Sequence, residues 1–283
     1  MRAFVSLLLL AAAAAAAPGA EAPSPLVTAV EAYVRDAEMR GFDTAAPFVR
    51  APAAGGAVGW LHLRVSYWYP SIDGEIASGG DRLDFRDDLG LDDNEGTVVP
   101  EVLLSIGSLG VRFDAFFLEF DGQSTITRPC TFGGVVFLVN EDVTSHVEIN
   151  HLRLLGTFPV VRSDFLELRV QGGLQVFDID GTVEGSTSGT SRASGTIPIP
   201  VVGVLAQIKV SRILLELDVA GLSIEYGDVE GTVLDARASV GVTVLKIVAV
   251  RAGYRVVFFD GSADDVTLDA TLEGFFVGAS ISF

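Results

Sequence analysis

Apolar and polar residues alternate over long stretches of this chain. In residues 232–244 the even positions from Leu234 to Val244 are all apolar, whereas the odd positions from Asp235 to Thr243 carry Asp, Arg, Ser, Gly and Thr. Because successive side chains of a β-strand point to opposite faces, such a stretch predicts a strand with one apolar and one polar face.

The alternation predicts ten strands, separated by clusters of Gly, Asp and Ser. The predicted strands span residues 60–76, 96–107, 110–126, 141–159, 163–180, 196–210, 212–226, 230–245, 247–260 and 266–283. Their connections are alternately short, as at 107–110 and 160–163, and longer, as at 78–95 and 181–195. Short turns at one end and longer loops at the other are typical of outer-membrane barrels. Most of the strands also reach the roughly 9–11 residues that a tilted membrane-spanning strand needs.

The predicted fold is therefore all-β: a single antiparallel up-and-down transmembrane β-barrel of about ten strands, with eight or twelve as alternatives. Both ends of the chain then lie on the periplasmic side, which requires an even number of strands. A soluble β protein with its apolar faces turned inward would show the same alternation and remains the alternative.

Two predicted strands change phase along their length. Val111, Phe113 and Phe117 share one face, but Leu118 and Phe120 carry the apolar character onto the other face. The last strand does the same between residues 272 and 275. A shift by one residue moves every side chain to the opposite face, so a β-bulge is expected at these points. The alternative is that the upper ends of the strands leave the bilayer and no longer need a lipid-facing side.

The N-terminal part has a different character. Residues 1–22 read as a secretory signal peptide, because Arg2 is followed by an apolar, alanine-rich run that ends in small residues. Residues 23–57 predict a periplasmic leader and linker, with a short helix at 26–40 that Gly41 would end. The barrel is assigned to residues 58–283.

The charge and the cysteine content of the chain exclude several kinds of partner and site. The net charge is −18 and the pI is near 4.4, so nucleic acid is a poor partner, since binding phosphates needs basic patches. Cys130 is the single cysteine, which excludes an intramolecular disulfide and a zinc site built from cysteines. The sequence predicts no cofactor and no metal centre.

The last strand carries a family resemblance. Residues 275–283 are apolar at every second position, from Phe275 to Ile281 and Phe283. This pattern resembles the C-terminal signature that outer-membrane barrels present to the barrel assembly machinery. Residues 83–91 and 113–122 also look like uncharacterised bacterial barrels of this size.

The resemblance covers residues 58–283 and is to small single-chain outer-membrane barrels of the OmpA and OmpW kind. It implies a location in the outer membrane, with membrane lipid, lipopolysaccharide and the assembly machinery as partners. It transfers no functional residue to this chain.

The polar faces of the strands are unusually charged. The residues expected to point into the lumen are Arg64, Glu101, Arg112, Asp114, Glu148, Glu167, Arg169, Lys209, Glu216, Asp218, Asp235, Arg237, Arg251 and Arg255. In a barrel of eight to ten strands such side chains largely fill the interior. Two interpretations follow: a closed core of salt bridges, or a narrow polar pore.

The first predicted loop, between residues 78 and 95, is strongly acidic. Its cluster comprises Asp87, Asp88, Asp92, Asp93 and Glu95. Carboxylates suit divalent cations such as calcium, but the spacing does not match an EF-hand loop. Solubility, or bridging through cations to lipopolysaccharide, explains the cluster equally well.

An enzymatic role would need a base and a nucleophile. His146 and Glu148 share a strand face, whereas Ser145 points to the other side. Sequence neighbours do not make a catalytic triad, which is defined by geometry. A polar histidine in the lumen is the preferred interpretation, and no catalytic residue is assigned.

The sequence therefore predicts an outer-membrane β-barrel with a structural role or a narrow, porin-like channel for small solutes. The alternatives are an outer-membrane hydrolase acting on lipid A and a surface adhesin or binding barrel.

Overall fold

The computed structural model describes residues 60–78, 81–91, 96–226, 229–245, 247–263 and 266–283. The predicted signal peptide, leader helix and linker lie outside these ranges. Within them, no helix is long and apolar enough to cross a membrane.

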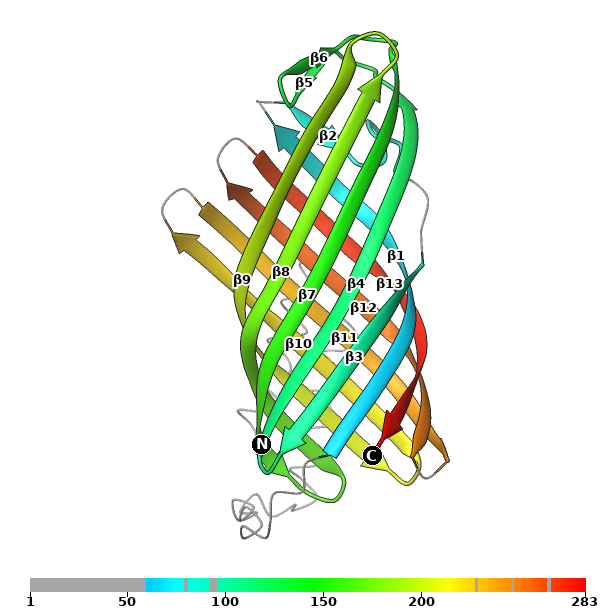
Figure 1. Ribbon diagram of the computed structural model, residues 1–283, viewed down its shortest axis with the longest axis vertical. Helices are drawn as coiled ribbons and strands as arrows, with labels where there is room; N and C mark the ends of the chain where they lie inside the picture. The colour runs from blue at the N-terminus through cyan, green and yellow to red at the C-terminus, as the bar shows by residue number, and fades with distance from the viewer. Residues whose placement is uncertain (1–59, 79–80, 92–95, 227–228, 246, 264–265) are drawn as a thin grey trace, which may run out of the picture. The chain divides into compact units, whose positions relative to one another are not determined.

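Ten antiparallel strands form a closed barrel (Figure 1). They are β1 (Trp60–Ser78), β3 (Thr97–Ile106), β4 (Leu109–Thr125), β7 (Asp142–Arg162), β8 (Leu166–Gly185), β9 (Gly189–Val210), β10 (Ile213–Tyr226), β11 (Val229–Leu245), β12 (Val248–Ala263) and β13 (Val266–Ser282). β13 pairs with β1 from Ser282↔His62 to Val266↔Ser78 and so closes the sheet. The all-β class, the antiparallel barrel and the strand number predicted from the sequence are confirmed.

Three short strands lie outside the barrel wall. β2 (Arg82–Asp84) pairs with the upper end of β1, and β5 (Cys130–Phe132) pairs with β6 (Val135–Phe137) in a separate hairpin. These strands belong to the two longest connections within the barrel, between β1 and β3 and between β4 and β7.

The long loop expected at residues 181–195 is absent, and that prediction is wrong. β8 runs on to Gly185 and β9 begins at Gly189, so only three residues connect them. Val183 and Ser191 point inward and are buried, while their neighbours face solvent. The Gly, Ser and Thr residues that suggest a loop in the sequence belong to the solvated ends of two long strands.

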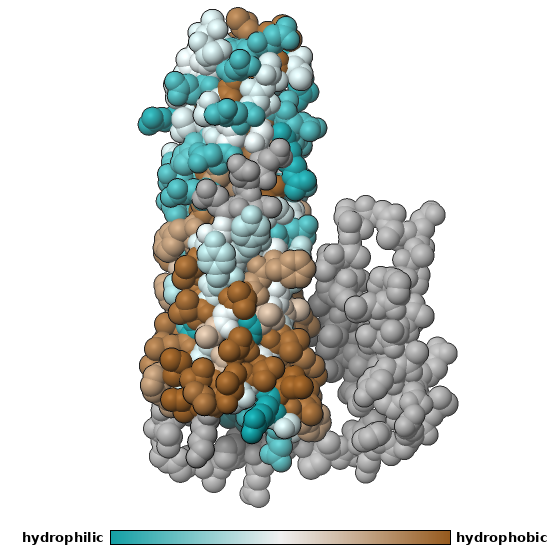
Figure 2. Space-filling model, turned by 90° about the vertical axis from the view of Figure 1, so that its right-hand side faces the viewer, coloured by the Kyte–Doolittle hydropathy of each residue, from teal (hydrophilic) through white to brown (hydrophobic). Residues whose placement is uncertain are grey.

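The outer surface has an apolar lower part and a polar upper part (Figure 2). Large exposed apolar residues cover the end of the barrel where β1 begins and β13 ends; they include Val65, Leu104, Val111, Leu154, Val170, Val210, Leu215, Val242, Val250 and Val277. Exposed aromatic residues border this belt, with Tyr69, Phe117 and Phe275 above and Phe158 and Phe165 below. An apolar band between aromatic girdles is the lipid-facing surface of an outer-membrane barrel.

The phase shift in β4 involves no bulge. Arg112, Asp114, Phe116, Leu118 and Phe120 all point inward, and the pairing of β4 with β7 is regular throughout. The environment changes instead: inside the belt the interior is charged, and above the belt it is apolar. The predicted bulge is therefore wrong and the alternative, strand ends that leave the bilayer, accounts for the pattern. β13 also pairs regularly through residues 272–275.

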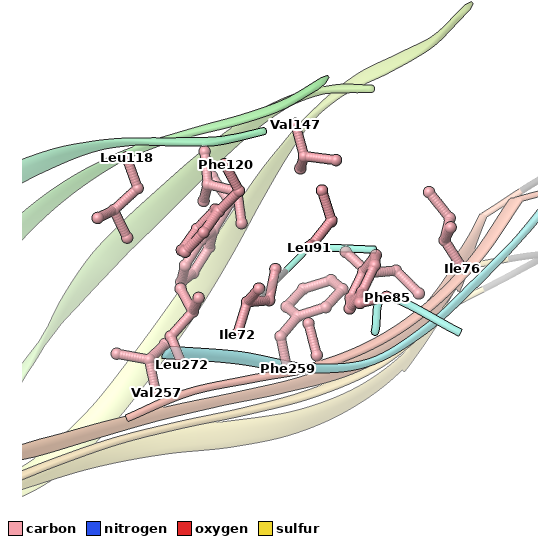
Figure 3. Close-up of a cluster of buried hydrophobic side chains, with 14 of the residues drawn as sticks. Ile72, Ile76, Phe85, Leu91, Leu118, Phe120, Val147, Val257, Phe259 and Leu272 are labelled. Atoms are coloured by element: carbon pink, nitrogen blue, oxygen red, sulfur yellow. The ribbon is translucent and has the colours of Figure 1, made fainter. Parts of the chain in front are cut away.

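Above the belt the wall separates into two facing sheets. The upper parts of β4, β7, β8 and β9 form one, called here the tall sheet, and the upper parts of β10 to β13 and β1 form the other, the facing sheet. Figure 3 shows Leu118, Phe120 and Val147 of the tall sheet pointing toward the facing sheet. Phe85 and Leu91, from the β1–β3 connection, fill space between them.

Candidate functional site

The lumen at the level of the belt holds a network of buried charges. Its members are the carboxylates Glu101, Asp114, Glu216, Asp218 and Asp235 and the guanidinium groups of Arg64, Arg112, Arg153, Arg237, Arg251 and Arg255, none more than 7% exposed. They project from seven strands, because the inward positions of the strands carry the charges in this part of the barrel.

Arg153 lies at the centre of the network. Its three nitrogens contact three carboxylates: Asp114 at 2.7 Å, Asp235 at 2.9 Å and Asp218 at 3.2 Å. The side chain is fully buried. One cation thus joins carboxylates from β4, β10 and β11 across the lumen.

The periplasmic part of the network is built in the same way. Arg64 contacts Glu101 at 2.8 Å and Glu216 at 2.9 Å. Arg237 donates to Glu101 at 2.9 Å and to Asp218 at 3.0 Å. Each of these carboxylates therefore has at least two cationic partners, which is the condition under which buried charges are tolerated.

Arg251 is the least engaged cation of the network. Its nearest carboxylate contact is Glu216, at 3.7 Å, and its guanidinium carbon lies 5.0 Å from the ring centre of Phe276. The network has six cations and five carboxylates, and Arg251 is the cation that has no carboxylate closer than 3.7 Å.

A layer of rings lies directly above the charges. Trp68 meets Phe116 at 5.1 Å between ring centres, Phe116 stacks on His151 at 4.5 Å, and His151 meets Phe177 at 4.6 Å. Phe177 in turn lies 5.8 Å from Phe259 of β12. The layer crosses the barrel from β1 to β12 and separates the charged network from the apolar core above.

The structure places most of the charges predicted for the lumen inside it. Arg64, Glu101, Arg112, Asp114, Arg169, Glu216, Asp218, Asp235, Arg237, Arg251 and Arg255 are inward and buried. Glu167 and Lys209 line a cavity of about 390 Å³ at the periplasmic mouth, where Lys209 is exposed. Arg169 donates to Glu167 at 2.7 Å in the same place.

The sequence prediction for the lumen is wrong at two positions of β7. Glu148 lies on the outer wall, and Arg153, which was not predicted, lies inside. A lumen position for Glu148 would turn its neighbours Val147 and Ile149 toward lipid. Both point into the apolar core above the membrane, so the whole phase of β7 was inverted at this point.

His146 also lies on the outer wall, above the belt, and not in the lumen as preferred from the sequence. Its Nδ1 is 2.7 Å from a carboxylate oxygen of Asp121, and its Nε2 is 3.1 Å from one of Glu148. Hydrogen bonds to the two carboxylates raise the pKa of His146 above its usual value. Ser145 points to the interior and is fully buried, so it does not form a triad with His146.

The outer-wall carboxylates are arranged in rows across the strands. Glu148 of β7 lies directly opposite Glu119 of β4 and Asp180 of β8. Like charges in directly opposed positions destabilise a sheet. A protonated His146 beside Glu148 offsets part of that repulsion.

The acidic loop predicted as a cation site is only partly described. Asp92, Asp93 and Glu95 lie outside the described residues. Asp88 accepts hydrogen bonds from the amide of Asp84 at 3.1 Å and from Arg128 at 3.4 Å. Among the residues that the structure describes, no group of three or more His, Cys, Asp or Glu side chains is arranged to hold a metal ion.

Glu141, which the sequence did not single out, clamps two extracellular connections together. Its carboxylate accepts hydrogen bonds from the amides of Leu138 at 2.9 Å, Thr187 at 2.7 Å and Ser188 at 2.6 Å, and from the Ser188 hydroxyl. These donors lower the pKa of Glu141 to about 2. No local motif predicts this role, since Thr187 and Ser188 lie 46 and 47 residues away in the sequence.

The C-terminal residues of the predicted assembly signal face outward. Phe283 is exposed and Ile281 is partly exposed on the lipid side of the barrel. Recognition by the assembly machinery stays a prediction.

Comparison with known proteins gives a likeness of fold. No protein-family model matches the chain, and no curated protein matches its sequence. The crystal structure of the outer-membrane protease OmpT from Escherichia coli is similar with a TM-score of 0.53 and 11% identity, over 79% of this chain and 97% of that one. The attachment invasion locus protein Ail of Yersinia pestis (TM-score 0.35, 11% identity, 80% and 99% coverage) and the neisserial surface protein NspA (0.30, 10%, 81% and 100%) are also similar.

At these identities the likeness concerns the fold alone. The fold is that of bacterial outer-membrane β-barrels, and the apolar belt supplies the surface that such a barrel presents to lipid. The chain is an outer-membrane β-barrel protein.

Proposed function

We propose that this outer-membrane barrel is closed to solutes and acts as a surface binding protein, with its tall extracellular extension as the working part. The observation that carries the proposal is the buried network around Arg153, which occupies the lumen at the level of the membrane. Of the two interpretations of the lumen charges, this favours a closed core over a narrow pore.

Two further features support a closed barrel. The ring layer from Trp68 to Phe259 crosses the lumen above the charges, and an apolar core fills the space above the rings. A hydrated ion passing through would have to displace paired charges and then enter apolar surroundings, and both steps are costly.

The extension supports a role at the cell surface. β7, β8 and β9 have 20 to 22 residues each, about twice what a tilted strand needs to cross the membrane. The outer face of the additional length is polar, and the Glu141 clamp ties its loops together. A rigid wall of this kind suits the presentation of a binding surface.

Conductance in planar lipid bilayers tests the closed barrel. We expect no unitary conductance from the refolded full-length protein. A variant with Arg112, Arg153 and Arg255 all changed to Ala removes the centre of the network and serves as a comparison that is expected to leak. Stable unitary steps from the unaltered protein, with a size that the triple variant changes, contradict the proposal and favour a narrow channel.

A further inference from the structure

In the part of the chain that the structure describes, the wall of the barrel is open along one seam above the belt. β9 pairs with β10 only from Val210↔Ile213 to Val202↔Gly221. Above this point residues 189–201 of β9 pair with β8 alone, and no other strand of the described residues pairs with their second edge. Figure 1 shows β9 continuing to the top of the tall sheet while β10 and β11 turn away from it.

Two prolines explain where the seam begins. Pro198 and Pro200 stand just above the last pair between β9 and β10. Proline has no amide hydrogen, so it cannot donate to a neighbouring strand and is confined to sheet edges. The backbone groups of even-numbered β9 residues point toward the β10 side, because the alternation set at Val202↔Gly221 continues along the strand.

Above the prolines the edge has full hydrogen-bonding capacity. Ser194 and Thr196 direct both their N–H and their C=O groups to the open side, while Pro198 and Pro200 offer carbonyls there. Their register with β8 remains regular, at Asp180↔Ser194 and Asp178↔Thr196. Such a row of unpaired groups is the template that pairs with an added strand.

The opposite seam, between β1 and β4, is covered by the chain itself. Residues 85–91 occupy it: the amide of Phe85 donates to the carbonyl of Gly74 in β1 at 3.0 Å. On the other side the Ser124 hydroxyl of β4 donates to the carbonyl of Asp87 at 3.3 Å. A polypeptide segment therefore fits between the two sheets, and only one of the two seams has such a segment among the described residues.

The chemistry along the open seam differs between its inner and outer sides. On the inner side Ile197 and Ala193 of β9 and Ile179 of β8 are only partly buried against the core. On the outer face Asp178, Asp180 and Glu184 of β8 stand one strand from the edge. Among described residues of this face, Asp180 and Glu184 have no ion-pair partner.

We propose that the β9–β10 seam binds an extended peptide segment of a partner protein, which adds to the free edge of β9 as a strand. The segment would place apolar side chains inward, against Ile197 and Ala193, and cationic side chains outward, toward the carboxylates of β8. The inference deepens the proposed function, since it names the partner class of the extension. A lipid or a sugar does not match the edge, because neither carries the regular alternation of donors and acceptors that Ser194 and Thr196 present.

Binding is tested with the full-length protein in detergent and a fluorescent peptide of alternating Val and Lys, measured by anisotropy. A peptide of alternating Val and Glu is the charge control. We expect the Val-Lys peptide to bind and the Val-Glu peptide to bind at least about tenfold more weakly, because like charges would oppose the β8 carboxylates.

The decisive test compares two variants that differ in the edge amides. Ser194→Pro with Thr196→Pro removes two donors on the open side, and neighbouring Pro198 and Pro200 show that β9 accepts proline at even positions. Ser194→Val with Thr196→Val is the matched control, which loses the same hydroxyls but keeps both amides. We expect the proline variant to bind about tenfold more weakly or worse, since two backbone hydrogen bonds are lost, and the valine variant to bind like the unaltered protein.

Hydrogen exchange of the unaltered protein gives a second measure that needs no variant. The amides of Ser194 and Thr196 are expected to become protected when the Val-Lys peptide is added. Equal binding by the proline and valine variants, no protection of these amides, or no binding of the Val-Lys peptide overturns the proposal. Conductance is a separate measurement, so a closed barrel that fails to bind the peptide loses this inference and keeps the closed lumen.

Discussion

Replacing Arg153 by Met should destabilise the barrel far more than the same replacement at Arg251. Both changes remove one buried cation from the same network and bring its formal balance from six cations against five carboxylates to five against five. If only the balance mattered, the two variants would be equally stable. The structure predicts otherwise, because the contacts of the two side chains differ.

Arg153 holds three carboxylates within 3.2 Å. Without it, Asp218 keeps Arg112 at 2.7 Å, but Asp114 keeps only Arg255 at 3.5 Å and Arg112 at 4.0 Å. One carboxylate is thus left buried and poorly paired, for which about 3–5 kcal/mol is the usual cost. Arg251 has a single carboxylate contact, at 3.7 Å, and Glu216 keeps Arg64 at 2.9 Å without it. Its loss leaves no carboxylate without a close cationic partner, so it should cost clearly less than the loss of Arg153.

Equilibrium unfolding by guanidinium chloride in detergent micelles measures the difference, with tryptophan fluorescence as the probe because Trp68 is buried above the network. Heat-modifiable migration on a denaturing gel checks that each variant folds before unfolding begins. Free energies of unfolding that agree within about 1 kcal/mol for the two variants would refute the reasoning, since specific pairing would then contribute less than net charge.

Two predictions concern the extension above the membrane. Asp121 and Glu148 raise the pKa of His146, so its stabilising effect is complete below about pH 6.5 and is lost as the pH rises through the raised value. The stability difference between the unaltered protein and His146→Gln should therefore shrink between pH 6 and 9, by less than about 1 kcal/mol because the site is partly exposed. A difference that stays constant with pH contradicts the pairing of His146 with these carboxylates. The hydrogen bonds of Glu141 lower its pKa to about 2, so its contribution is present above about pH 4.5 and is lost as the pH falls toward 2. Glu141→Gln should speed hydrogen exchange at Leu138, Thr187 and Ser188 near neutral pH, while Glu184→Gln on the exposed wall should leave it unchanged. Equal exchange rates in both variants contradict the role of Glu141 in holding the two connections together.

The barrel wall could be predicted from the sequence because its signals are local. In β11 the apolar residues from Leu234 to Val244 face outward, while Asp235 and Arg237 point inward, as the alternation requires. Nine of the ten predicted strands begin within three residues of the observed ones, and only β9 departs further, since it begins at Gly189 in place of residue 196. Period-two alternation needs no knowledge of distant residues, since it follows from the geometry of the extended chain.

Above the membrane the apolar side chains of the alternating pattern point inward, whereas within the membrane they point outward to lipid. Water replaces lipid on the outside, so Val147 and Ile149 point inward and His146 and Glu148 outward. The sequence alone does not mark the height at which the strands leave the bilayer, and the phase of β7 was assigned incorrectly for that reason. The height at which each strand leaves the bilayer depends on how neighbouring strands are staggered around the closed barrel.

The sequence by itself determined the class, the strands and the charged character of the lumen, because each follows from the order of residues along one strand. The tertiary structure decided which charges meet, since Arg153 joins Asp114, Asp218 and Asp235 from three other strands. It also decided that one seam is covered by residues 85–91 and that the described residues leave the other uncovered. Contacts of this kind depend on the stagger of strands around a closed sheet, which no single stretch of sequence specifies.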